Sequence, residues 1–596
     1  MKHLNRKALL PVVVSLALFT GACASTGTTG SAATTTVSSA AASAVAGQTA
    51  AQTLAQNATV AEVADTSGQT EQTITLSGTT ATSTSDAVTV EGGAVTITAA
   101  GTYRVSGTLS DGQVVVNVPG DGVVTVILDG ADITNSTGSP LVFADAQSAV
   151  VRLADGSQNT LTDASTPAAD SGSGDTGTAT ETDGPNAALF STADLIITGT
   201  GALTVHGNGN DGITGKDGLV IESGTITVDA VDDGIRGKDY LVIKGGTITV
   251  TAGGDGLKSD NNQDATMGYI AMEGGTLAVT AGGDGLDAAT DVVVAAGSMQ
   301  VRAGGGSGAS VTDDTSVKGL KGSAGVVVDG GTVTVDAADD AVHSNGSVTV
   351  NGGELNLSSG DDGVHADGDV VIGNGTVTVA RSYEGIEGST VTLAGGEVEV
   401  TSSDDGINAA SQLTIGGGTV VVNADGDGLD SNGSAAISGG VVVVNGPTEN
   451  MNGALDTDGE LTITGGVLLA VGSSGMAQAP DVSSAQGWVA ASFAAAQPAG
   501  TVGHVVSSDG TVLASFTASK AFSSLVYSSP DITDGSTYTV VTGGSVSGTE
   551  IGGLATGGSV DGATSVGTFT AGQAPAGGMG GVMGGGMGGS GQRPGG

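Results

Sequence analysis

Carboxylates recur at a fixed spacing through the middle of the chain. An Asp-Gly-aliphatic step returns about every 22 residues, and a second acid precedes several of these aspartates, as at Asp232-Asp233. The step begins at Asp211, Asp233, Asp255, Asp284, Asp362, Asp405 and Asp427, and it recurs at Asp340 with alanine in place of the glycine and at Glu384 with glutamate in place of the aspartate. Carboxylate and amide oxygens are the ligands that a hard cation such as calcium prefers. The chemistry open to this pattern is cation binding, provided that the fold brings the carboxylates together.

The segments between these steps predict short strands. Runs such as LVI at 241–243 and TITV at 247–250 are apolar or alternate between apolar and polar residues, and glycine turns separate them. A unit of about 22 residues cannot bury an apolar face alone, so each unit must lie on the next. We predict an all-β parallel β-helix solenoid with about 22 residues per coil. Its inward residues would include Leu219, Ile221, Ile226 and Val228, and its outward residues Thr225 and Thr227.

Stacked coils would place equivalent carboxylates about 5 Å apart. Two like charges at that distance repel by on the order of 1 to 3 kcal/mol, so protons, basic side chains or a metal must neutralise the row. Basic residues surround the first five coils, at Lys216, Arg236, Lys238, Lys258, Lys318 and Lys321. The coils from 340 to 430 have His343 and His365 but almost no lysine.

We therefore predict Ca²⁺ as a cofactor, with ligands drawn from the acidic row. The candidate ligands are Asp211, Asp232, Asp233, Asp255, Asp260, Asp284, Asp287, Asp340 and Asp362. In the alternative interpretation, each aspartate bonds its own turn, the following glycine supplies a positive φ, and no metal binds. A nonapeptide calcium roll does not fit a period of 22. Transition metals are not expected, because the histidines after the signal region show no compact ligand spacing.

The two ends of the chain indicate export. Residues 1–22 have basic residues before an apolar run and predict a lipoprotein-type signal peptide, with Cys23 as the lipidation site. Ordinary signal cleavage that leaves a free thiol is the alternative. We predict an Ala/Thr/Ser-rich tether at 23–72, the solenoid at 73–475 with a mobile insert at 163–186, a C-terminal β cap at 476–548 and a disordered tail at 549–596. The expected location is extracellular, lipid-anchored to the bacterial cell envelope.

The charge of the chain limits its partners. Sixty-one acidic and 16 basic residues give a formal net charge of −45, which disfavours nucleic acid and anionic membrane surfaces. No apolar run after the signal is long enough to span a membrane, so we expect contact with the membrane only through the lipid. We expect a monomer.

Several long phrases resemble one family. NGNDGITGKDGLVIESGTITV, GGDGLKSDNNQDATMGYIAMEGGTLAVTAGGDGLDAATD and GSSGMAQAP are similar to bacterial secreted carbohydrate-binding domain-containing proteins. The resemblance implies a right-handed parallel β-helix, similar in shape and calcium placement to the family 9 pectate lyases. It also implies calcium binding and attachment to polysaccharide, such as cellulose or acidic pectic chains.

Two irregular spacings suggest where a ligand would bind. Extra residues follow Ser259 and Gly297, and loops on a regular solenoid commonly carry binding residues. Calcium could bridge a sugar carboxylate there, with Arg236, Lys238 or Lys258 pairing directly and Asn261 nearby. Tyr240, Tyr269 and Tyr383 could stack on sugar rings, although simple packing at a turn is the alternative explanation for each of them.

The predicted function is calcium-dependent, non-catalytic binding of polysaccharide at the cell surface. A calcium-dependent pectate lyase is the first alternative, with Lys258 or Lys238 as the candidate base, although lysines among acids make poor bases. A structural surface spike or adhesin is the second alternative.

Overall fold

The computed structural model describes residues 47–63, 69–120, 122–164, 184–312 and 315–574. The expected signal peptide, Cys23, most of the expected insert at 163–186 and the end of the expected tail lie outside the described residues. Within the described parts of the chain, no helix has the length and apolar character needed to cross a membrane.

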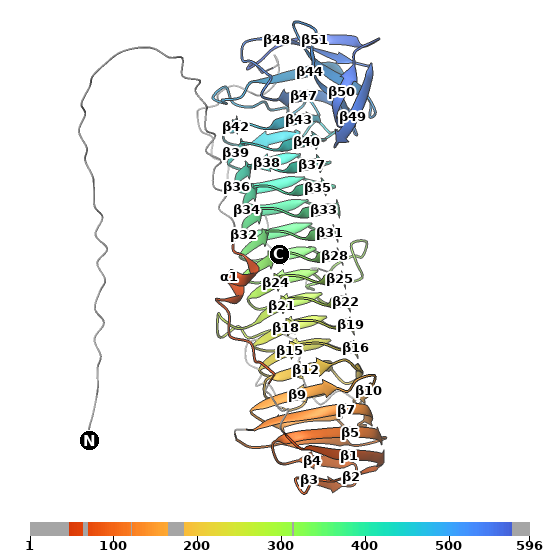
Figure 1. Cartoon of the computed structure of the whole chain (residues 1–596). Helices are drawn as coiled ribbons and strands as arrows, with labels where there is room; N and C mark the ends of the chain where they lie inside the picture. The colour runs from red at the N-terminus through yellow and green to blue at the C-terminus, as the bar shows by residue number, and fades with distance from the viewer. Residues whose placement is uncertain (1–46, 64–68, 121, 165–183, 313–314, 575–596) are drawn as a thin grey trace, which may run out of the picture. The chain divides into compact units, whose positions relative to one another are not determined.

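The repeat folds as a parallel β-solenoid of about 15 turns, roughly 23 residues apart, which confirms the predicted fold class. Each coil contributes three short strands, and strands of successive coils pair in parallel to form three columns (Figure 1). The first strand column contains β8 (Leu141–Asp145), β11 (Ala187–Ser191), β14 (Asp211–Gly215), β17 (Ile235–Gly237), β20 (Leu257–Ser259), β23 (Leu286–Ala288), β26 (Leu320–Gly322), β29 (Val342–Ser344), β38 (Leu429–Ser431) and β41 (Leu455–Thr457).

The second strand column follows the first along the chain of each coil. It contains β9 (Ser148–Leu153), β12 (Leu195–Gly199), β15 (Gly218–Ile221), β18 (Tyr240–Ile243), β21 (Tyr269–Met272), β24 (Asp291–Val294), β27 (Gly325–Val328), β30 (Ser347–Val350), β39 (Ser434–Ile437) and β42 (Leu461–Ile463). Three longer strands run through both columns, namely β32 (Val364–Ile372), β34 (Ile386–Leu393) and β36 (Ile407–Ile415).

The third strand column closes each coil. It contains β10 (Gln158–Thr162), β13 (Ala202–Gly207), β16 (Thr225–Ala230), β19 (Thr247–Ala252), β22 (Thr276–Ala281), β25 (Ser298–Ala303), β28 (Thr332–Ala337), β31 (Glu354–Ser359), β33 (Thr376–Arg381), β35 (Glu397–Thr401), β37 (Thr419–Asn423), β40 (Val441–Asn445) and β43 (Val467–Gly472).

The core runs inside the three columns. The predicted inward residues are 0–1% exposed, whereas Thr225 and Thr227 lie on the exposed side of β16, so the predicted alternation is confirmed. In-register pairing stacks identical or similar aliphatic residues, for example Ile226 on Ile248 and then Leu277. Burial of these side chains supplies the main stabilising free energy, because one short coil has too little apolar contact of its own.

Other strands occupy the two ends of the solenoid. The N-terminal strands are β1 (Glu71–Gly78), β2 (Thr80–Ser83), β3 (Val88–Glu91), β4 (Ala94–Ile97), β5 (Gly101–Leu109), β6 (Gln113–Asn117) and β7 (Val123–Thr134). Here β1 and β2 form an antiparallel pair, as do β3 and β4, while β5 and β7 continue the parallel stacking.

The C-terminal strands are antiparallel. They comprise β44 (Trp488–Gln497), β45 (Val502–Ser507), β46 (Val512–Thr517), β47 (Phe522–Ser528), β48 (Thr537–Thr542), β49 (Ser545–Ile551), β50 (Leu554–Ser559) and β51 (Thr564–Thr570). Strand β47 pairs with β43 and β44, and the other six form a separate sheet. The β region therefore extends beyond the expected boundary at 548, because β50 and β51 complete that sheet.

An N-terminal segment, residues 47–63, packs on the outside of the second strand column. It contains the short helix α1 (Ala50–Leu54), and Ala50 joins Tyr240, Tyr269 and neighbouring residues in a buried apolar cluster. Tyr269 donates to the Ala58 carbonyl at 2.9 Å. We expected a flexible tether at 23–72, and for this part of it the structure shows a docked segment. Alanines and short apolar residues there cover apolar side chains of the solenoid.

Candidate functional site

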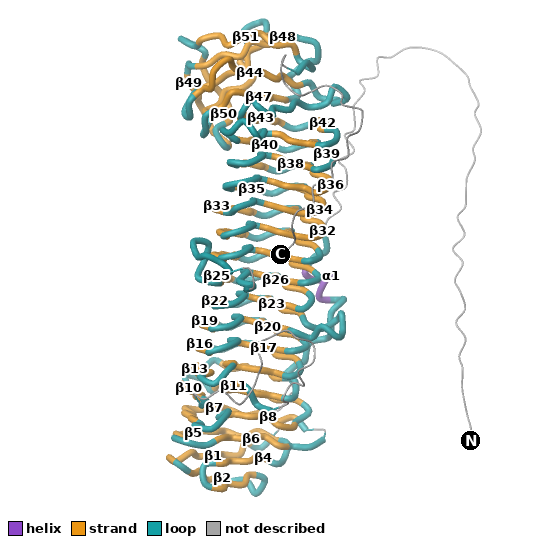
Figure 2. The backbone as a smooth tube through the Cα atoms, turned by 180° about the vertical axis from the view of Figure 1, so that it is seen from behind, coloured by secondary structure: helices purple, strands orange, loops and turns teal. Residues whose placement is uncertain are grey.

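The Asp-Gly steps lie at the entrance to the first strand column, shown from behind in Figure 2. Stacking aligns them in one row, which we call the Asp-Gly column. Its members are Asp211, Asp233, Asp255, Asp284, Lys318, Asp340, Asp362, Glu384, Asp405 and Asp427. The backbone confirms the alignment, because the amide that follows one member bonds the carbonyl of the next, as Gly234 N does to Asp255 O at 2.8 Å.

The aspartate side chains also bond from coil to coil. Oδ1 of Asp233 accepts the backbone amide of Asp255 at 2.9 Å, and Oδ1 of Asp255 accepts that of Asp284 at 2.8 Å. Asp405 accepts the Asp427 amide at 2.6 Å in the same way. We expected, without metal, that each aspartate would bond its own turn. Instead these aspartates bond an amide of the following coil, which gives the residue type a structural role along the stack.

The glycine of the Asp-Gly step is needed for space. A Cβ on Gly256 would lie 2.2 Å from Val279 Cγ1, and one on Gly406 would lie 2.2 Å from Val422 Cγ1. Positive φ values occur instead at the second glycine of the later turn, as at Gly246 with φ of 94°. The expectation that the Asp-Gly glycine supplies a positive φ was therefore wrong, because the valine of the third strand column fills the position of a side chain.

A second row stands three residues after the Asp-Gly column. We call it the +3 column, and strand register aligns Thr214, Arg236, Lys258, Asp287, Lys321, His343, His365, Glu387, Asn408, Asp430 and Asp456. Its character changes along the stack. Basic residues predominate up to His365, and the four later members are acidic or neutral.

In the earlier coils the two columns neutralise each other. Lys258 Nζ lies 2.7 Å from Asp255 Oδ2 and 3.2 Å from Asp233 Oδ2. Lys321 pairs with Asp284 at 2.9 Å and with Asp287 at 3.1 Å. Six of the nine predicted metal ligands thus have a lysine or arginine partner without any metal, since Arg236 also pairs with Asp260 and Lys318 bonds Asp340.

The other predicted ligands have different surroundings. Asp211 accepts from Thr214 Oγ1 at 2.8 Å, and burial raises its pKa to about 6. Asp362 lies 2.9 Å from His365. Asp232 lies in the turn beside the column, where its carbonyl accepts the Gly254 amide at 3.0 Å.

The predicted sugar contacts are largely occupied. Tyr240 and Tyr269 stack on each other with centroids 5.7 Å apart, but they are 5% and 1% exposed beneath residues 57–61. Stacking on a sugar does not fit that placement. Asn261 Nδ2 donates to Asp239 at 2.6 Å, and the Lys238 carbonyl accepts the Asn261 amide at 2.9 Å. The loop after Ser259 therefore contacts neighbouring coils and the N-terminal segment rather than an open groove.

The later coils combine many carboxylates with few basic groups. Among the described residues no ion pair to Lys or Arg is formed by Glu384, Glu387, Asp405, Asp427, Asp430 or Asp456. Burial, then the carboxylates of Asp405 and Asp427, raises the pKa of Asp430 to about 7. Burial is likewise the first cause that raises the pKa of Glu384 to about 7 and that of Asp427 to about 6. We call residues 383–458 of the two columns the acidic coils.

One buried oxygen in the acidic coils lacks a partner. Asn408 lies between Glu387 and Asp430 in register, and its Nδ2 donates to Glu384 Oε2 at 3.1 Å. Its Oδ1 is buried and accepts no hydrogen bond. A buried oxygen without a donor costs free energy, on the order of 1 to 3 kcal/mol. Oxygen atoms gathered in this way suit a hard cation with several oxygen ligands.

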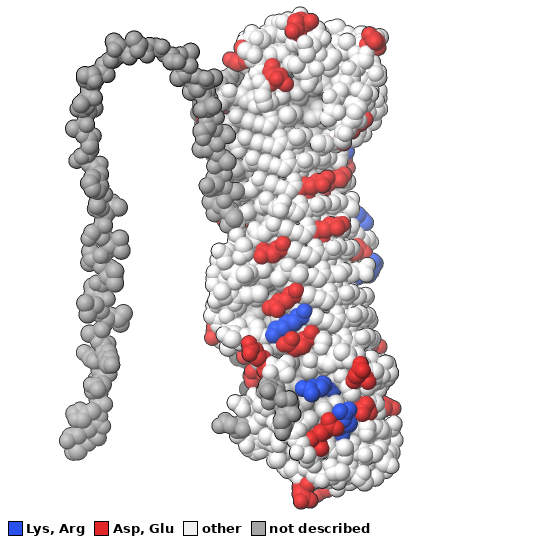
Figure 3. All heavy atoms as spheres, in the orientation of Figure 1, with Lys and Arg blue, Asp and Glu red and all other residues white. Residues whose placement is uncertain are grey.

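An open cleft of about 440 Å³ lies beside the point where the two kinds of coil meet. Asp339, Asp361 and Arg381 line it together with residues of the 307–315 loop. On the face shown in Figure 3, most of the surface carries neither acidic nor basic side chains.

The site was only partly visible in the sequence. The alignment of carboxylates and the scarcity of lysine after residue 340 were predicted, and the ion pairs of the earlier coils agree with that charge pattern. The +3 column was missed as a continuous row. Its signal was present, because the third residue after each Asp-Gly step is polar or charged in every one of these coils.

Comparisons with known proteins give two findings. The family model described as carbohydrate-binding domain-containing protein matches residues 91–363 and 364–547, more than half of the chain. The chain is also similar to the solved polysaccharide lyase-like protein from C. thermocellum, in a gadolinium derivative, at 27% identity and a TM-score of 0.36. That match covers 51% of this chain and 97% of the other. The comparison with curated proteins finds no match.

Proposed function

Because this chain belongs to the carbohydrate-binding domain-containing protein family, we propose that it binds polysaccharide without cleaving it. We further propose that the binding depends on calcium and that the ligand is an acidic, pectin-like chain. The observation that carries the proposal is the charge imbalance of the acidic coils. A polyanionic glycan would be repelled there unless a cation lay between the two sets of carboxylates.

The residue types of the acidic coils suit a calcium ion. Carboxylates of Asp405, Asp427 and Asp430 and the unpartnered Oδ1 of Asn408 are all hard oxygen donors. The earlier coils fit less well, because lysine ammonium groups already occupy the carboxylates there. When bound, calcium would lower the repulsion among these groups and offer remaining coordination positions to carboxylates of the glycan. The proposed metal site thus moves from the sequence-predicted aspartates to the later coils.

One exposed ring lies at the edge of the acidic coils. Tyr383 is 48% exposed, and its carbonyl accepts the Asp404 amide at 2.9 Å. It is the aromatic side chain that the structure leaves most open among the aromatic residues of the described ranges. Its apolar ring face can contact a sugar ring while ions and hydrogen bonds hold the polar groups. We therefore assign to Tyr383, rather than to Tyr240 or Tyr269, the stacking role that the sequence suggested for all three.

A binding assay tests this function. The full mature chain is applied to covalently immobilised polygalacturonate and to cellulose, with either calcium or a chelator in the buffer. We expect retention on polygalacturonate with calcium and roughly a tenfold loss with chelator, since each tenfold change corresponds to about 1.4 kcal/mol. Cellulose has no carboxylates, so chelator should leave any retention on it unchanged.

Two variants locate the calcium. Asn408→Lys adds an ammonium group to the acidic coils and should abolish the calcium dependence. Asp430→Asn should weaken retention on polygalacturonate, whereas the same change at the exposed Asp229 of the third strand column should not. Retention of the native chain equal to that of a non-binding protein would contradict polysaccharide binding. Retention that ignores chelator would contradict the calcium.

Lys258, the candidate base for a lyase, forms ion pairs with two aspartates. Burial alone would lower the pKa of Lys258, but the carboxylates of Asp233 and Asp255 raise it above its ordinary value. A lysine in that state holds its proton and does not remove one from a sugar. We therefore expect no increase in the absorbance of unsaturated uronides when the chain is incubated with polygalacturonate and calcium. An increase that Lys258→Ala abolishes would establish a lyase.

The location on the cell is a further part of the proposal. Cys23 would carry the lipid that holds the protein, as a monomer, on the outside of the bacterial envelope. Metabolic labelling with a fatty acid analogue should mark the native chain, and Cys23→Ser should remove the label and release the protein to the medium. Labelling that persists in Cys23→Ser would contradict the anchor.

A further inference from the structure

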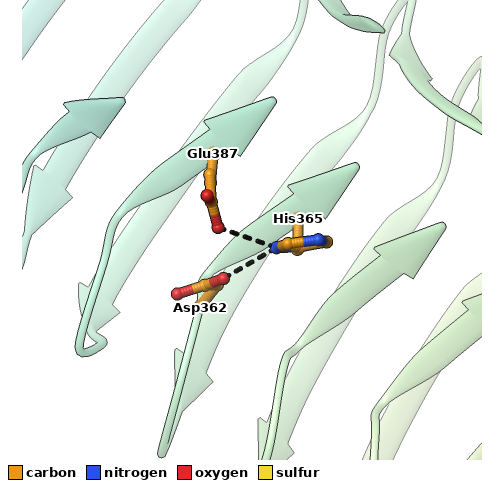
Figure 4. A group of neighbouring side chains, drawn as sticks. All are labelled: Asp362, His365 and Glu387. Carbon is orange, nitrogen blue, oxygen red and sulfur yellow. Dashed lines mark hydrogen bonds and ion pairs between the residues drawn. The ribbon is translucent and has the colours of Figure 1, made fainter. Parts of the chain in front are cut away.

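Three side chains from two coils meet around one imidazole nitrogen (Figure 4). Asp362 precedes β32, His365 lies within β32, and Glu387 lies in β34 of the next coil. Nδ1 of His365 is 2.9 Å from Asp362 Oδ2 and 2.9 Å from Glu387 Oε2. The nitrogen and one oxygen of each carboxylate all lie within 4.8 Å of one another. These side chains are 8%, 22% and 35% exposed, so an ion can reach the group from solvent.

A proton does not satisfy this arrangement fully. Nδ1 of an imidazole carries at most one hydrogen, and one N–H can be directed well at only one of two oxygens. The group therefore presents one ring nitrogen and two carboxylate oxygens, and a single proton on the nitrogen bonds well to only one of those oxygens.

We propose that Asp362, His365 and Glu387 bind a divalent transition-metal ion, with Zn²⁺ as the best fit. Zinc accepts imidazole nitrogen at about 2.0 to 2.1 Å and carboxylate oxygen at about 2.0 to 2.2 Å. In a tetrahedral site these lengths set donors about 3.3 Å apart. The two nitrogen–oxygen separations of 2.9 Å require a shift of only a few tenths of an ångström, and the two carboxylate oxygens lie within 4.8 Å of each other. Three protein donors leave one position for water or a ligand group.

The surroundings hold the imidazole in place. The ring of His343 stacks on that of His365, with centroids 5.0 Å apart and planes 10° apart. Nε2 of His365 lies 3.5 Å from Asp367 Oδ1. A carboxylate beside the second ring nitrogen is the usual support of a metal-binding histidine, because it fixes which nitrogen faces the metal. The site does not depend on the proposed polysaccharide binding.

The preceding coil provides an internal comparison. His343 Nδ1 lies 2.7 Å from Asp340 Oδ2, as His365 does from Asp362, but the next residue of the +3 column is His365 and not a carboxylate. Lys318 also bonds Asp340 at 2.7 Å. The two histidines thus share ring stacking and an aspartate three residues earlier, and they differ in the third donor. Sequence spacing concealed the site, because Asp362 and Glu387 become neighbours only when coils stack.

Metal titration of the full chain without a histidine tag tests the proposal. After chelator treatment and dialysis, the protein is titrated with Zn²⁺ in millimolar Ca²⁺, and with Co²⁺ as a visible-absorption probe. We expect one tight zinc ion per chain that calcium does not displace. His365→Asn and Glu387→Gln should each weaken zinc binding by roughly tenfold or more, whereas His206→Asn in β13, outside the site, should leave it within about twofold.

The variants also decide against the proposal. Circular dichroism and thermal melting establish that each variant is folded, so lost binding can be assigned to the removed donor. Zinc affinity that is unchanged in His365→Asn and Glu387→Gln would overturn the site. Equal loss in His206→Asn would overturn this set of donors, and complete displacement of zinc by calcium would overturn the choice of metal.

Discussion

Two regions of the solenoid share one backbone plan and differ in how their carboxylates are neutralised. The coils from Asp211 to His343 place lysine, arginine and histidine in the +3 column, where they pair with acids of their own and adjacent coils. The acidic coils from Glu384 to Asp456 have the same turns and the same coil-to-coil amide bonds but place acids and one asparagine there.

The comparison separates two roles of the repeated aspartate. Oδ1 of Asp233 and Oδ1 of Asp405 each accept a backbone amide of the next coil, so this role is common to both regions. The second oxygen differs in its surroundings. Lys258 neutralises it at Asp233, and no lysine or arginine does so at Asp405 within the described chain. The aspartate thus links coils in both regions, and the +3 column decides whether its charge remains available to an external cation.

The largest effect should follow from removing a cation of the earlier coils. Lys258→Met leaves Asp233 and Asp255 without their shared partner, and an unpaired, mostly buried charge is costly. We expect the free energy of unfolding at pH 7 to fall by about 3 kcal/mol. The measurement is the urea midpoint of the full chain.

Lys244→Met is the control for that substitution. Lys244 pairs with Glu222 at 2.9 Å, and both side chains are more than a quarter exposed. Its loss should cost less than about 1 kcal/mol, because water screens such a pair. Equal losses of stability in Lys258→Met and Lys244→Met would show that an ion pair between the two columns stabilises the fold no more than an exposed pair does.

Packing, in contrast, should be equal in the two regions. Gly256→Ala and Gly406→Ala each force a Cβ to within 2.2 Å of a valine methyl group. We expect each to lower the free energy of unfolding by about 2 kcal/mol, as overpacked cores usually do. Thermal melting of both variants measures the effect, with Gly308→Ala as the control, since its Cβ would come no closer than 3.7 Å to Arg381. A large difference between Gly256→Ala and Gly406→Ala would indicate that the coils differ in more than charge.

Much of this fold could be predicted from the sequence. The 22-residue period predicted the length of one coil. The alternation of polar and apolar residues, such as Thr225 and Ile226, predicted which side of each strand faces the core. The docked segment at 47–63 could not be predicted, because its alanine-rich composition also suits a tether and its contacts with Tyr240 and Tyr269 are long-range. The reason for glycine in the Asp-Gly step was also hidden, because the valine that excludes a side chain lies in the third strand column.

The sequence predicted that the carboxylates of the candidate site line up along the stack. It did not predict which side chains contact one another. Aligning the Asp-Gly steps places Asp405 beside Asp427, but it does not show that Asn408 has a buried oxygen without a donor. The distances around His365 likewise depend on which oxygen each carboxylate turns toward the ring. Register follows from the repeat, whereas side-chain direction follows from local packing.

The smallest expected effect is a difference in how the regions respond to pH. In the metal-free protein Asp430 has a pKa of about 7, raised first by burial and then by Asp405, Asp427 and other acids, from an ordinary value of 3.8. The folded state therefore binds the proton more tightly than the unfolded state. Its contribution to stability is full below pH 4 and is lost as the pH rises to about 7.

Asp430→Asn measures this contribution. At pH 5 the native carboxyl is protonated in the folded state, so the variant should melt within a few degrees of the native chain. At pH 8 the native carboxylate is charged among like charges, and the variant should be more stable by on the order of 1 kcal/mol after solvent screening is allowed for. Calcium should cancel the advantage, because it stabilises the native carboxylate and not the amide.

Asp340 provides the opposite case. Burial acts against its charge, but His343 and Lys318 lower its pKa to about 2, so its contribution is present above pH 4 and is lost only in stronger acid. A variant at Asp430 that behaves as one at Asp340 does would remove the contrast between these two carboxylates.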